Sequence, residues 1–402
     1  MNPLGAPPAY PVGPLGAEFN PGEDQGEAME LAGVLREAMS LGASDVHLKA
    51  RQYPILRVRG HLLRLENWPL LDPKDLEQMA GAMINNLQRQ RFDRDGGVDV
   101  QYTVAGIGRF RASIFRARAS IGIALRVIPY EPPTFEELHL PPVVAKLAME
   151  PRGLILVTGP AGSGKTTTLA SMVNHMNHHR TDHIVTIEDP IEYLFEDGTS
   201  IVTQREVGMD APGFAEALRI CLRQDPNVVM VGEMRDVETM QTVLTLAETG
   251  HLVLSTLHTI TAAETVNRII SQFPPDYERP IRQQLGQVLR GVVSQRLMQR
   301  ADEPGLIPAV EVLVGTLTVQ RCVEEPGRTA QLSQVISEGR DTYGMQSFNQ
   351  SAIEWYQKGM VSYEEARRTA TSQTDFEVEV ERLSLAHDVA TRKSAPSVPG
   401  RR

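Results

Sequence analysis

The apolar positions of the first 130 residues predict one helix followed by several strands. The helix is predicted just before Gly42, from apolar residues that recur at helical spacing, namely Leu31, Val34, Leu35, Ala38 and Leu41. Ile55 to Leu65 and Val98 to Ile128 have the composition of strands interrupted by glycines, and the stretch from Lys74 to Arg91 between them is predicted to be helical. This order predicts a small α+β domain over residues 26–130.

The pattern changes near residue 143. Helical segments such as Val237 to Thr249 now alternate with short apolar segments, which are Leu154 to Thr158, Ile184 to Ile187, Val228 to Val231 and Leu252 to Thr256. Such alternation is typical of a mostly parallel sheet covered by helices on both faces. After Val314 the chain is predicted to be helical to about Thr371. We therefore predict an α/β domain over residues 143–371.

Three further segments complete the predicted organisation of this chain, whose 402 residues exceed the usual size of a single core. Proline and glycine crowd residues 1–25, so this arm is predicted to be disordered. Residues 131–142 are rich in proline and are predicted to be an interdomain linker. Residues 372–402 form a polar tail, in which Phe376, Val378 and Val380 alternate with glutamates and predict either one edge strand or no order.

Composition restricts the partners and the compartment. A net charge of −10 does not suit a protein that binds phosphate backbones, so nucleic acid is not expected as a partner. No segment approaches the ~18 apolar residues that span a bilayer, and no signal peptide is recognisable. We expect a cytoplasmic protein that reaches the membrane only through a partner. The two cysteines, Cys221 and Cys322, are too far apart for a zinc site and are expected to be buried, reduced residues.

One contiguous motif carries the most specific chemistry. It satisfies G-x-x-x-x-G-K-[ST] and consists of Gly159, Pro160, Ala161, Gly162, Ser163, Gly164, Lys165 and Thr166, with Thr167 following. The glycines let backbone N–H groups converge on a triphosphate at a helix N-terminus. Lys165 would neutralise the β/γ oxygens, and the Thr166 hydroxyl would bind Mg²⁺. A strand precedes the motif and a helix follows, so we predict that it binds ATP with Mg²⁺.

A nucleotide site of this kind also needs carboxylates for the metal and for the attacking water. Two acidic clusters follow predicted strands: Glu188, Asp189 and Glu192 after the first, and Glu233 after the second. Ligands of open α/β sheets lie beyond the carboxyl ends of the strands, so both clusters are expected on the side of the phosphate motif. His258 also follows a strand. It is either a structural hydrogen-bonding residue or a group that reaches the γ-phosphate.

Taken together, these motifs resemble the secretion-type traffic ATPases and, within them, the type IV pilus retraction ATPases. The resemblance extends from about Leu41 to Arg368 and includes five motifs in order, which are Ala43 to Leu48, Gly159 to Thr166, Thr186 to Tyr193, Val231 to Asp236 and Gly250 to Thr259. It implies a RecA-like P-loop ATPase domain with a smaller N-terminal PAS-like domain. It also implies that the chain is a motor that assembles as a homohexamer.

The resemblance assigns roles to individual residues. Glu192 would be the catalytic glutamate, Glu188 and Asp189 would help to position metal and water, and Glu233 would be the Walker B carboxylate. His258 would sense the γ-phosphate. Thr166, Glu233 and Asp189 would be the metal ligands. Arg111 and Arg126 of the first domain would reach the nucleotide as catalytic arginines, whereas the sequence alone favours solvated strand residues at these two positions.

The resemblance also implies a cellular task. The motor would lie at the inner face of the cytoplasmic membrane and act on an inner-membrane pilus platform protein, driving retraction and twitching motility. Thr318 to Glu325 departs from the family pattern, since Gln320 and Glu324 replace arginines there, and this leaves the direction of motor action open. The alternatives are an accessory retraction ATPase, a pilus assembly or type II secretion ATPase, or a nucleotide-dependent binding module with negligible turnover.

Overall fold

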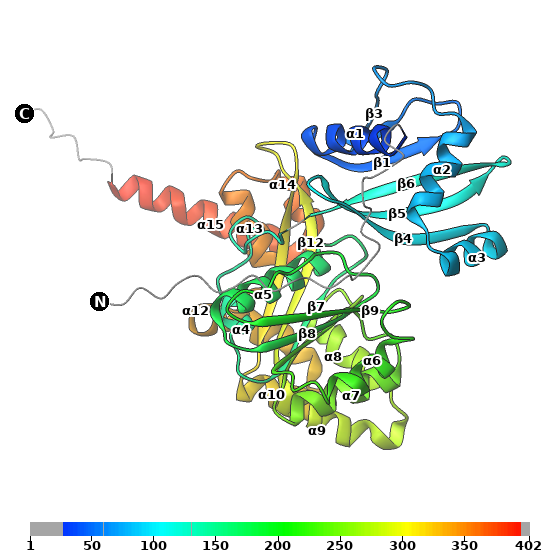
Figure 1. Cartoon of the computed structure of the whole chain (residues 1–402). Coiled ribbons are helices and arrows are strands. Elements are labelled where there is room, and N and C mark those ends of the chain that lie inside the picture. The colour runs from blue at the N-terminus through cyan, green and yellow to red at the C-terminus, as the bar shows by residue number, and fades with distance from the viewer. Residues whose placement is uncertain (1–26, 59, 130, 395–402) are drawn as a thin grey trace, which may run out of the picture. The chain divides into compact units, whose positions relative to one another are not determined.

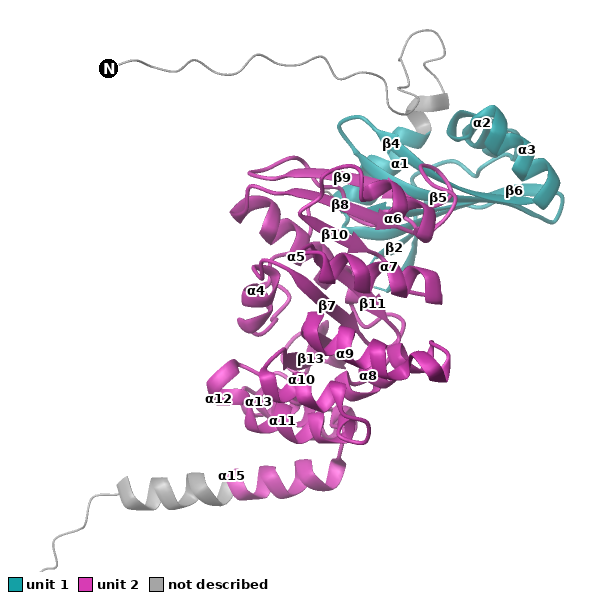
Figure 2. Cartoon of the chain, turned by 90° about the horizontal axis from the view of Figure 1, so that it is seen from below, with its two compact units in different colours: residues 1–130 teal, residues 131–402 magenta. Residues whose placement is uncertain are grey.

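The computed structural model describes residues 27–58, 60–129 and 131–394, with side chains from residue 31 to residue 383. The predicted arm over residues 1–25 and the last residues of the predicted tail lie outside this range. Two compact units divide the chain, residues 1–130 and residues 131–402 (Figures 1 and 2). Each unit has its own sheet and its own core.

The first unit is an antiparallel sheet covered by helices on one face. Its strand order is β3-β2-β1-β6-β5-β4. The elements in chain order are α1 (Glu27–Ser40), β1 (Ala43–Lys49), β2 (Ile55–Val58), β3 (His61–Arg64), α2 (Pro73–Met83), α3 (Asn86–Asp95), β4 (Gly97–Val104), β5 (Gly108–Ala117) and β6 (Ser120–Ile128). Alternate residues such as Val46, Ile114 and Leu125 are buried in a core shared with α1 and α2. Polar residues therefore occupy the opposite face.

Three details of the first unit differ from the prediction. Residues 43–49 form a strand, β1, that the apolar pattern did not predict. The single helical stretch is two helices, because the chain is extended at Ile84 and Asn85, and Asn85 caps α3 with Gln88 in a capping box. Gly122 lies within β6 instead of interrupting it, and the adjacent turn is made by Arg118 and Ala119 at positive φ.

The second unit has a seven-stranded sheet in the order β13-β12-β7-β11-β10-β8-β9. All neighbouring pairs are parallel except β12 with β13. The sheet region comprises α4 (Val143–Ala148), β7 (Gly153–Thr158), α5 (Lys165–His179), β8 (His183–Glu188), β9 (Ile201–Glu206), α6 (Phe214–Cys221), β10 (Val228–Val231), α7 (Val237–Glu248), β11 (Leu252–Leu257), α8 (Ala262–Ser271), α9 (Glu278–Val288), β12 (Leu289–Gln299) and β13 (Leu306–Val314).

Alternate residues of these strands are buried in two different clusters. Leu156 and Val229 pack with residues of α6 to α9, whereas Ile155 and Val228 pack with residues of α4 and α5. Helices thus cover both faces of a mostly parallel sheet, which confirms the predicted α/β fold. The prediction missed β9, β12 and β13. Both cysteines are buried and free, as expected.

The segment predicted as a linker packs on the second unit. Phe135 and Leu140 are buried against Leu169 and Met172 of α5. The hydroxyl of Ser171, also on α5, donates a hydrogen bond to the carbonyl oxygen of Pro133. The segment is therefore packed on α5, the helix that follows the phosphate motif.

The C-terminal region is helical, as predicted, but the helices extend further. They are α10 (Leu317–Glu324), α11 (Leu332–Glu338), α12 (Arg340–Tyr343), α13 (Phe348–Gln357), α14 (Tyr363–Thr369) and α15 (Gln373–Ser394). The prediction of an edge strand or no order was wrong for α15. Phe376 is fully buried, and Val380 and Leu383 pack beside it at helical spacing, whereas Val378 is exposed. This packing outweighs the short alternation of apolar and acidic residues.

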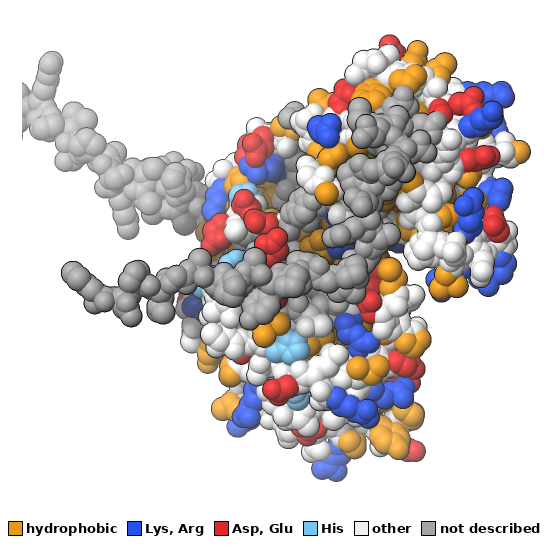
Figure 3. Space-filling model, viewed as in Figure 1, with side chains coloured by type: hydrophobic (Ala, Val, Ile, Leu, Met, Phe, Trp, Pro, Cys, Tyr) orange, Lys and Arg blue, Asp and Glu red, His pale blue; other side chains and the backbone are white. Residues whose placement is uncertain are grey.

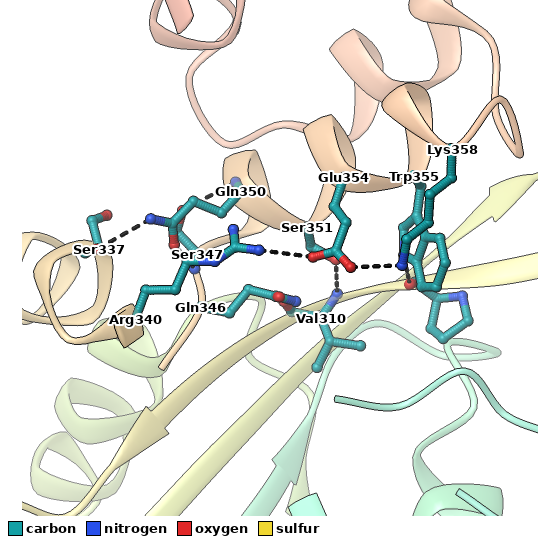
Figure 4. Close-up of polar contacts among 11 residues, drawn as sticks. Val310, Ser337, Arg340, Gln346, Ser347, Gln350, Ser351, Glu354, Trp355 and Lys358 are labelled. Carbon is teal, nitrogen blue, oxygen red and sulfur yellow. Dashed lines mark hydrogen bonds and ion pairs between the residues drawn. The ribbon is translucent and has the colours of Figure 1, made fainter. Parts of the chain in front are cut away.

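Side chains of the C-terminal region cover the edge strand β13 (Figure 4). The Val310 N–H donates to Ser351 Oγ over 3.1 Å, and Gln346 Nε2 donates to the Val310 carbonyl over 2.9 Å. The indole N–H of Trp355 donates to the carbonyl of Pro308 over 3.0 Å. The free edge of the sheet is therefore capped by its own chain. On the face drawn in Figure 3, acidic and basic side chains are interspersed.

Candidate active site

The phosphate loop, Gly159 to Thr166, connects the end of β7 to the start of α5. Gly159, Gly162 and Gly164 have φ angles of 145°, 77° and 88°, which residues with a Cβ rarely adopt. A Cβ on Gly159 would also lie 2.4 Å from the carbonyl oxygen of Gln295 on β12. The glycines thus allow a turn in which backbone N–H groups gather at the N-terminus of α5, as phosphate binding requires.

Lys165 and Ser163 complete the loop. The Lys165 ammonium donates to the carbonyl oxygens of Gly159 and Pro160, each over 2.9 Å. Burial lowers the pKa of Lys165, while the nearby carboxylate of Glu233 acts in the opposite direction. Ser163 Oγ is buried and has no hydrogen-bond partner among the described residues. A buried hydroxyl, a desolvated cation and a glycine cradle fit a phosphate ligand.

The strands β8, β10 and β11 bring Asp189, Glu233 and His258 together. These strands are neighbours in the sheet, and Val231 pairs with Ile187 on one side and Ser255 on the other. Because the three strands are parallel, the residues that follow them meet at one edge. His258 Nε2 lies 3.1 Å from Glu233 Oε1, so His258 and Glu233 interact directly.

An arginine that the sequence did not single out joins this cluster. Arg235 Nε donates to Glu233 Oε2 over 2.9 Å, and its Nη1 donates to Asp189 Oδ2 over 3.3 Å. The hydrogen bond to Glu233 raises the pKa of Arg235. A pocket of about 380 Å³ opens beside the cluster and is lined by residues that include Glu233, Arg235, His258 and Arg268. Among the described residues, no three His, Cys, Asp or Glu side chains are close enough to hold a metal alone.

Glu188 and Glu192 occupy different environments although they are four residues apart. Glu188 is only 5% exposed, and its carboxylate accepts hydrogen bonds from Thr186 Oγ1 over 2.7 Å and from Gln204 Nε2 over 3.1 Å. Burial raises the pKa of Glu188. Glu192 is exposed. The adjacent Tyr193 hydroxyl donates to Thr167 Oγ1 over 3.4 Å, so the segment that carries Glu192 lies beside the start of α5.

Arg111 and Arg126 lie in the first unit, directly opposite each other on β5 and β6. They project from the same face of the sheet, because paired residues of antiparallel strands share a face. Arg126 Nε donates to Asp45 Oδ1 over 3.0 Å, and Arg111 Nη2 donates to Asp99 Oδ2 over 3.4 Å. Their side chains are 72% and 42% exposed, respectively. The two arginines form a pair on the polar face of the sheet.

Comparison with known proteins agrees with this geometry. The family model for the type II/IV secretion system proteins matches residues 24–377. The type IV pilus retraction ATPase PilT of Pseudomonas aeruginosa is 40% identical over 348 residues, which cover 87% of this chain and 100% of that protein. The type IV pilus ATPase PilU of the same organism is 38% identical, with 87% and 90% covered.

A solved structure gives the same result. The crystal structure of the pilus retraction motor PilT with bound ADP matches with a TM-score of 0.80 and 43% identity, and the match covers 86% of this chain and 98% of that one. No helix among the described residues is both long enough and apolar enough to cross a bilayer. The resemblance to the retraction ATPases is confirmed. Because the family model covers most of both units, we conclude that this chain is an ATPase of the type II/IV secretion system family.

Proposed function

We propose that this ATPase is the motor that drives type IV pilus retraction, acting through an inner-membrane platform protein. The observation that carries the proposal is the length of the match to PilT of Pseudomonas aeruginosa. That match covers 100% of the relative, so it includes the sheet of the first unit as well as the nucleotide site. A chain with only the ATPase unit would share the chemistry but not the arginines of the first unit.

The phosphate loop would bind ATP through its backbone N–H groups. On binding, Lys165 would exchange the carbonyl oxygens of Gly159 and Pro160 for the β/γ oxygens of the nucleotide. Thr166, Glu233 and Asp189 would hold Mg²⁺, which usually takes one or two carboxylates and fills its other positions with water and phosphate oxygens. When bound, Mg²⁺ would neutralise charge on the transferred phosphoryl group. Arg235 pairs with both of these carboxylates, Asp189 and Glu233.

For hydrolysis, we assign the water-orienting role to Glu192. It is exposed, and its loop contacts the start of α5 through Tyr193. Glu188 is buried at the start of the loop, where its carboxylate accepts hydrogen bonds from Thr186 and Gln204. His258 contacts Glu233 and would report the γ-phosphate to the α8 segment that follows it.

The arginine pair motivates a homohexamer. Arg111 and Arg126 are both more than a third exposed and present guanidinium groups from one face of the sheet. If a neighbouring subunit supplied its nucleotide to this face, the arginines would stabilise the charge that spreads over the γ-phosphoryl oxygens. Repeated head-to-tail contacts of this kind close into a ring. The ring would act at the inner face of the cytoplasmic membrane, attached through the platform protein alone.

The test is a deletion of the gene, scored for surface pili and twitching motility. Loss of the retraction motor should give cells that carry excess pili and do not move. A strain that expresses the Lys165→Ala variant should behave in the same way, whereas the wild-type gene should restore movement. Bald cells would indicate an assembly motor and would contradict the proposal. Retained retraction with reduced force would indicate an accessory ATPase.

A further inference from the structure

The segment that carries Glu192 is held by side chains of the neighbouring edge strand. This segment, residues 189–195, is called the carboxylate loop here. It follows β8 and leads toward β9, which pairs with β8 in parallel. Thr186 of β8 pairs with Gln204 of β9, and Glu188 pairs with Glu206. Two polar side chains of β9, Gln204 and Glu206, therefore lie beside the start of the loop.

The backbone of the carboxylate loop is satisfied mostly by these side chains. Glu206 Oε2 accepts from the Ile191 N–H over 3.1 Å. The Glu192 N–H donates to the carboxylate of Glu188. Gln204 Nε2 donates to the carbonyl oxygen of Tyr193 over 2.8 Å, and Gln204 Oε1 accepts from the Phe195 N–H over 3.0 Å. The loop has no regular structure of its own, so long-range bonds fix its path.

Gln204 is the member of this network with the most contacts to the loop. Its Nε2 also donates to Glu188 Oε1 over 3.1 Å, so one amide joins the loop backbone to the buried carboxylate that receives the Glu192 N–H. A carboxamide is the side chain that can donate twice and accept in this arrangement. Neither a carboxylate nor an apolar side chain could make all three bonds.

We infer that Gln204 is a positioning residue for hydrolysis, which fixes the backbone that follows Glu192 so that the Glu192 carboxylate can orient the attacking water. The inference rests on the proposed role of Glu192. Gln204 does not touch the phosphate loop in any contact described above, so it acts on the chemical step and leaves nucleotide binding alone. Small displacements of a catalytic group are costly, since an error of about 1 Å can reduce the rate on the order of 10²-fold.

The experiment measures kcat, KM for ATP and the affinity for a fluorescent ADP analogue in Gln204→Leu and Gln204→Glu. Leucine removes every polar contact, whereas glutamate keeps the acceptor for the Phe195 N–H and loses both donors. If the leucine variant does not fold, the glutamate variant carries the test. Thr203→Val is the matched control, because Thr203 is the preceding residue of β9 and contacts His183 instead of the loop.

Each Gln204 change is also made in the Glu192→Gln background. We expect kcat to fall by about tenfold or more in the wild-type background, with KM and ADP affinity changed by less than about twofold. In the Glu192→Gln background the same change should lower kcat by less than about twofold, because residues that act as a unit are not additive. The Thr203→Val control should keep wild-type kcat.

Other outcomes would overturn the inference. An equal loss of kcat in both backgrounds would mean that Gln204 acts independently of Glu192. An unchanged kcat, or a loss of ADP affinity as large as the loss of kcat, would also overturn the inference. Wild-type turnover in Glu192→Gln alone would overturn the proposed role of Glu192 and the inference with it. Because that last result is obtained without a change at Gln204, the two failures are distinguishable.

Discussion

The phosphate loop and the carboxylate loop both follow a parallel strand at the same edge of the sheet, yet they are built differently. The phosphate loop is shaped by its own glycines and by Lys165, which bonds to carbonyl oxygens five and six residues earlier. The carboxylate loop is shaped by Gln204 and Glu206, whose side chains lie nine to fifteen positions beyond the backbone groups that they bind. Local contacts therefore determine the conformation of the phosphate loop, and tertiary contacts determine that of the carboxylate loop.

This difference explains why only one of the two loops is recognisable from a contiguous sequence motif. The conformation of the phosphate loop depends on its own residues wherever a strand precedes them and a helix follows. The loop is therefore recognisable from a contiguous sequence motif. Long-range restraints depend on the pairing of β8 with β9, which no contiguous pattern encodes. We therefore expect changes in the phosphate loop to remove binding and catalysis together, and changes around the carboxylate loop to affect catalysis alone.

The largest effect should come from the phosphate loop. Lys165→Ala removes the buried cation that we expect to bind the β/γ oxygens of ATP, while the backbone cradle stays. We expect ATP binding to weaken and hydrolysis to be abolished, as measured by nucleotide titration and phosphate release. Lys146→Ala, at an exposed lysine of α4, is the control and should be active. Unchanged affinity and turnover in Lys165→Ala would remove this loop from the active site.

Substitutions of the arginine pair test whether a neighbouring subunit contributes residues to the active site. Arg126→Ala should lower turnover on the order of 10³–10⁵-fold if it supplies an arginine finger. Arg116→Ala is the matched control, since this exposed arginine of β5 pairs with Asp93 on α3. When Arg126→Ala is mixed with Glu192→Gln under conditions of subunit exchange, some interfaces regain an intact arginine and an intact glutamate, so activity should partly return. Absence of recovery despite exchange contradicts a shared site.

Changes in the carboxylate loop should reduce catalysis and leave nucleotide binding intact. Glu192→Gln keeps the backbone contacts of the loop and removes the charge to which we assign the orientation of the attacking water. We expect ATP affinity to be retained while kcat falls on the order of 10²–10⁴-fold, the usual cost of a lost general base. Parallel titration and turnover assays check this. Turnover near the wild-type value would transfer the role to Glu188 or Glu233.

The smallest effect is expected from a buried glutamate of β13 that forms a hydrogen bond with the start of α8. Glu311 of β13 is buried, and its Oε1 accepts from the N–H of Ala262, 49 positions away, at the start of α8. Burial raises the pKa of Glu311 from 4.5 to about 7. Between these values the unfolded chain binds fewer protons than the folded one, so the folded protein loses stability as pH rises. The loss is at most about 3 kcal/mol.

Glu311→Gln removes this titration and keeps an acceptor for the Ala262 N–H. Its free energy of unfolding relative to the wild type should therefore improve as pH rises from about 5 to about 8, by up to about 3 kcal/mol. Denaturant unfolding at several pH values measures this difference. Glu364→Gln, at an exposed glutamate of α14, should show a pH dependence parallel to the wild type. Parallel curves for Glu311→Gln would mean that Glu311 is ionised in the folded protein throughout this range.

Sequence patterns predicted the local part of the fold. The apolar strands of the second unit and the helix after Lys165 were predicted because each carries a contiguous signal. Asp189, Glu233 and His258 were predicted to gather because parallel strands end at one edge, and the structure brings them together. Arg111 and Arg126 were assigned by resemblance alone, and the pairing of β5 with β6 places them side by side.

Residues that act through tertiary contacts were not predicted. Arg235 lies within a recognised motif, but nothing in the sequence indicates that it contacts Asp189. Gln204 lies in a short polar strand at the sheet edge, where the apolar signal for β9 is weak. The helix α15 was missed for a related reason, because Phe376 is buried in a core that residues of α13, α14, β12 and β13 largely build, and its own segment does not indicate those contacts.

The covered edge of β13 has a consequence for assembly. Its outward N–H and C=O groups are occupied by Gln346, Ser351 and Trp355, so a second copy of the chain cannot extend the sheet at that edge by strand addition. Strand addition repeated from copy to copy would produce an open fibre. Any contact between copies at this end would therefore use side-chain surfaces, which can break and re-form without separating the strands of a sheet.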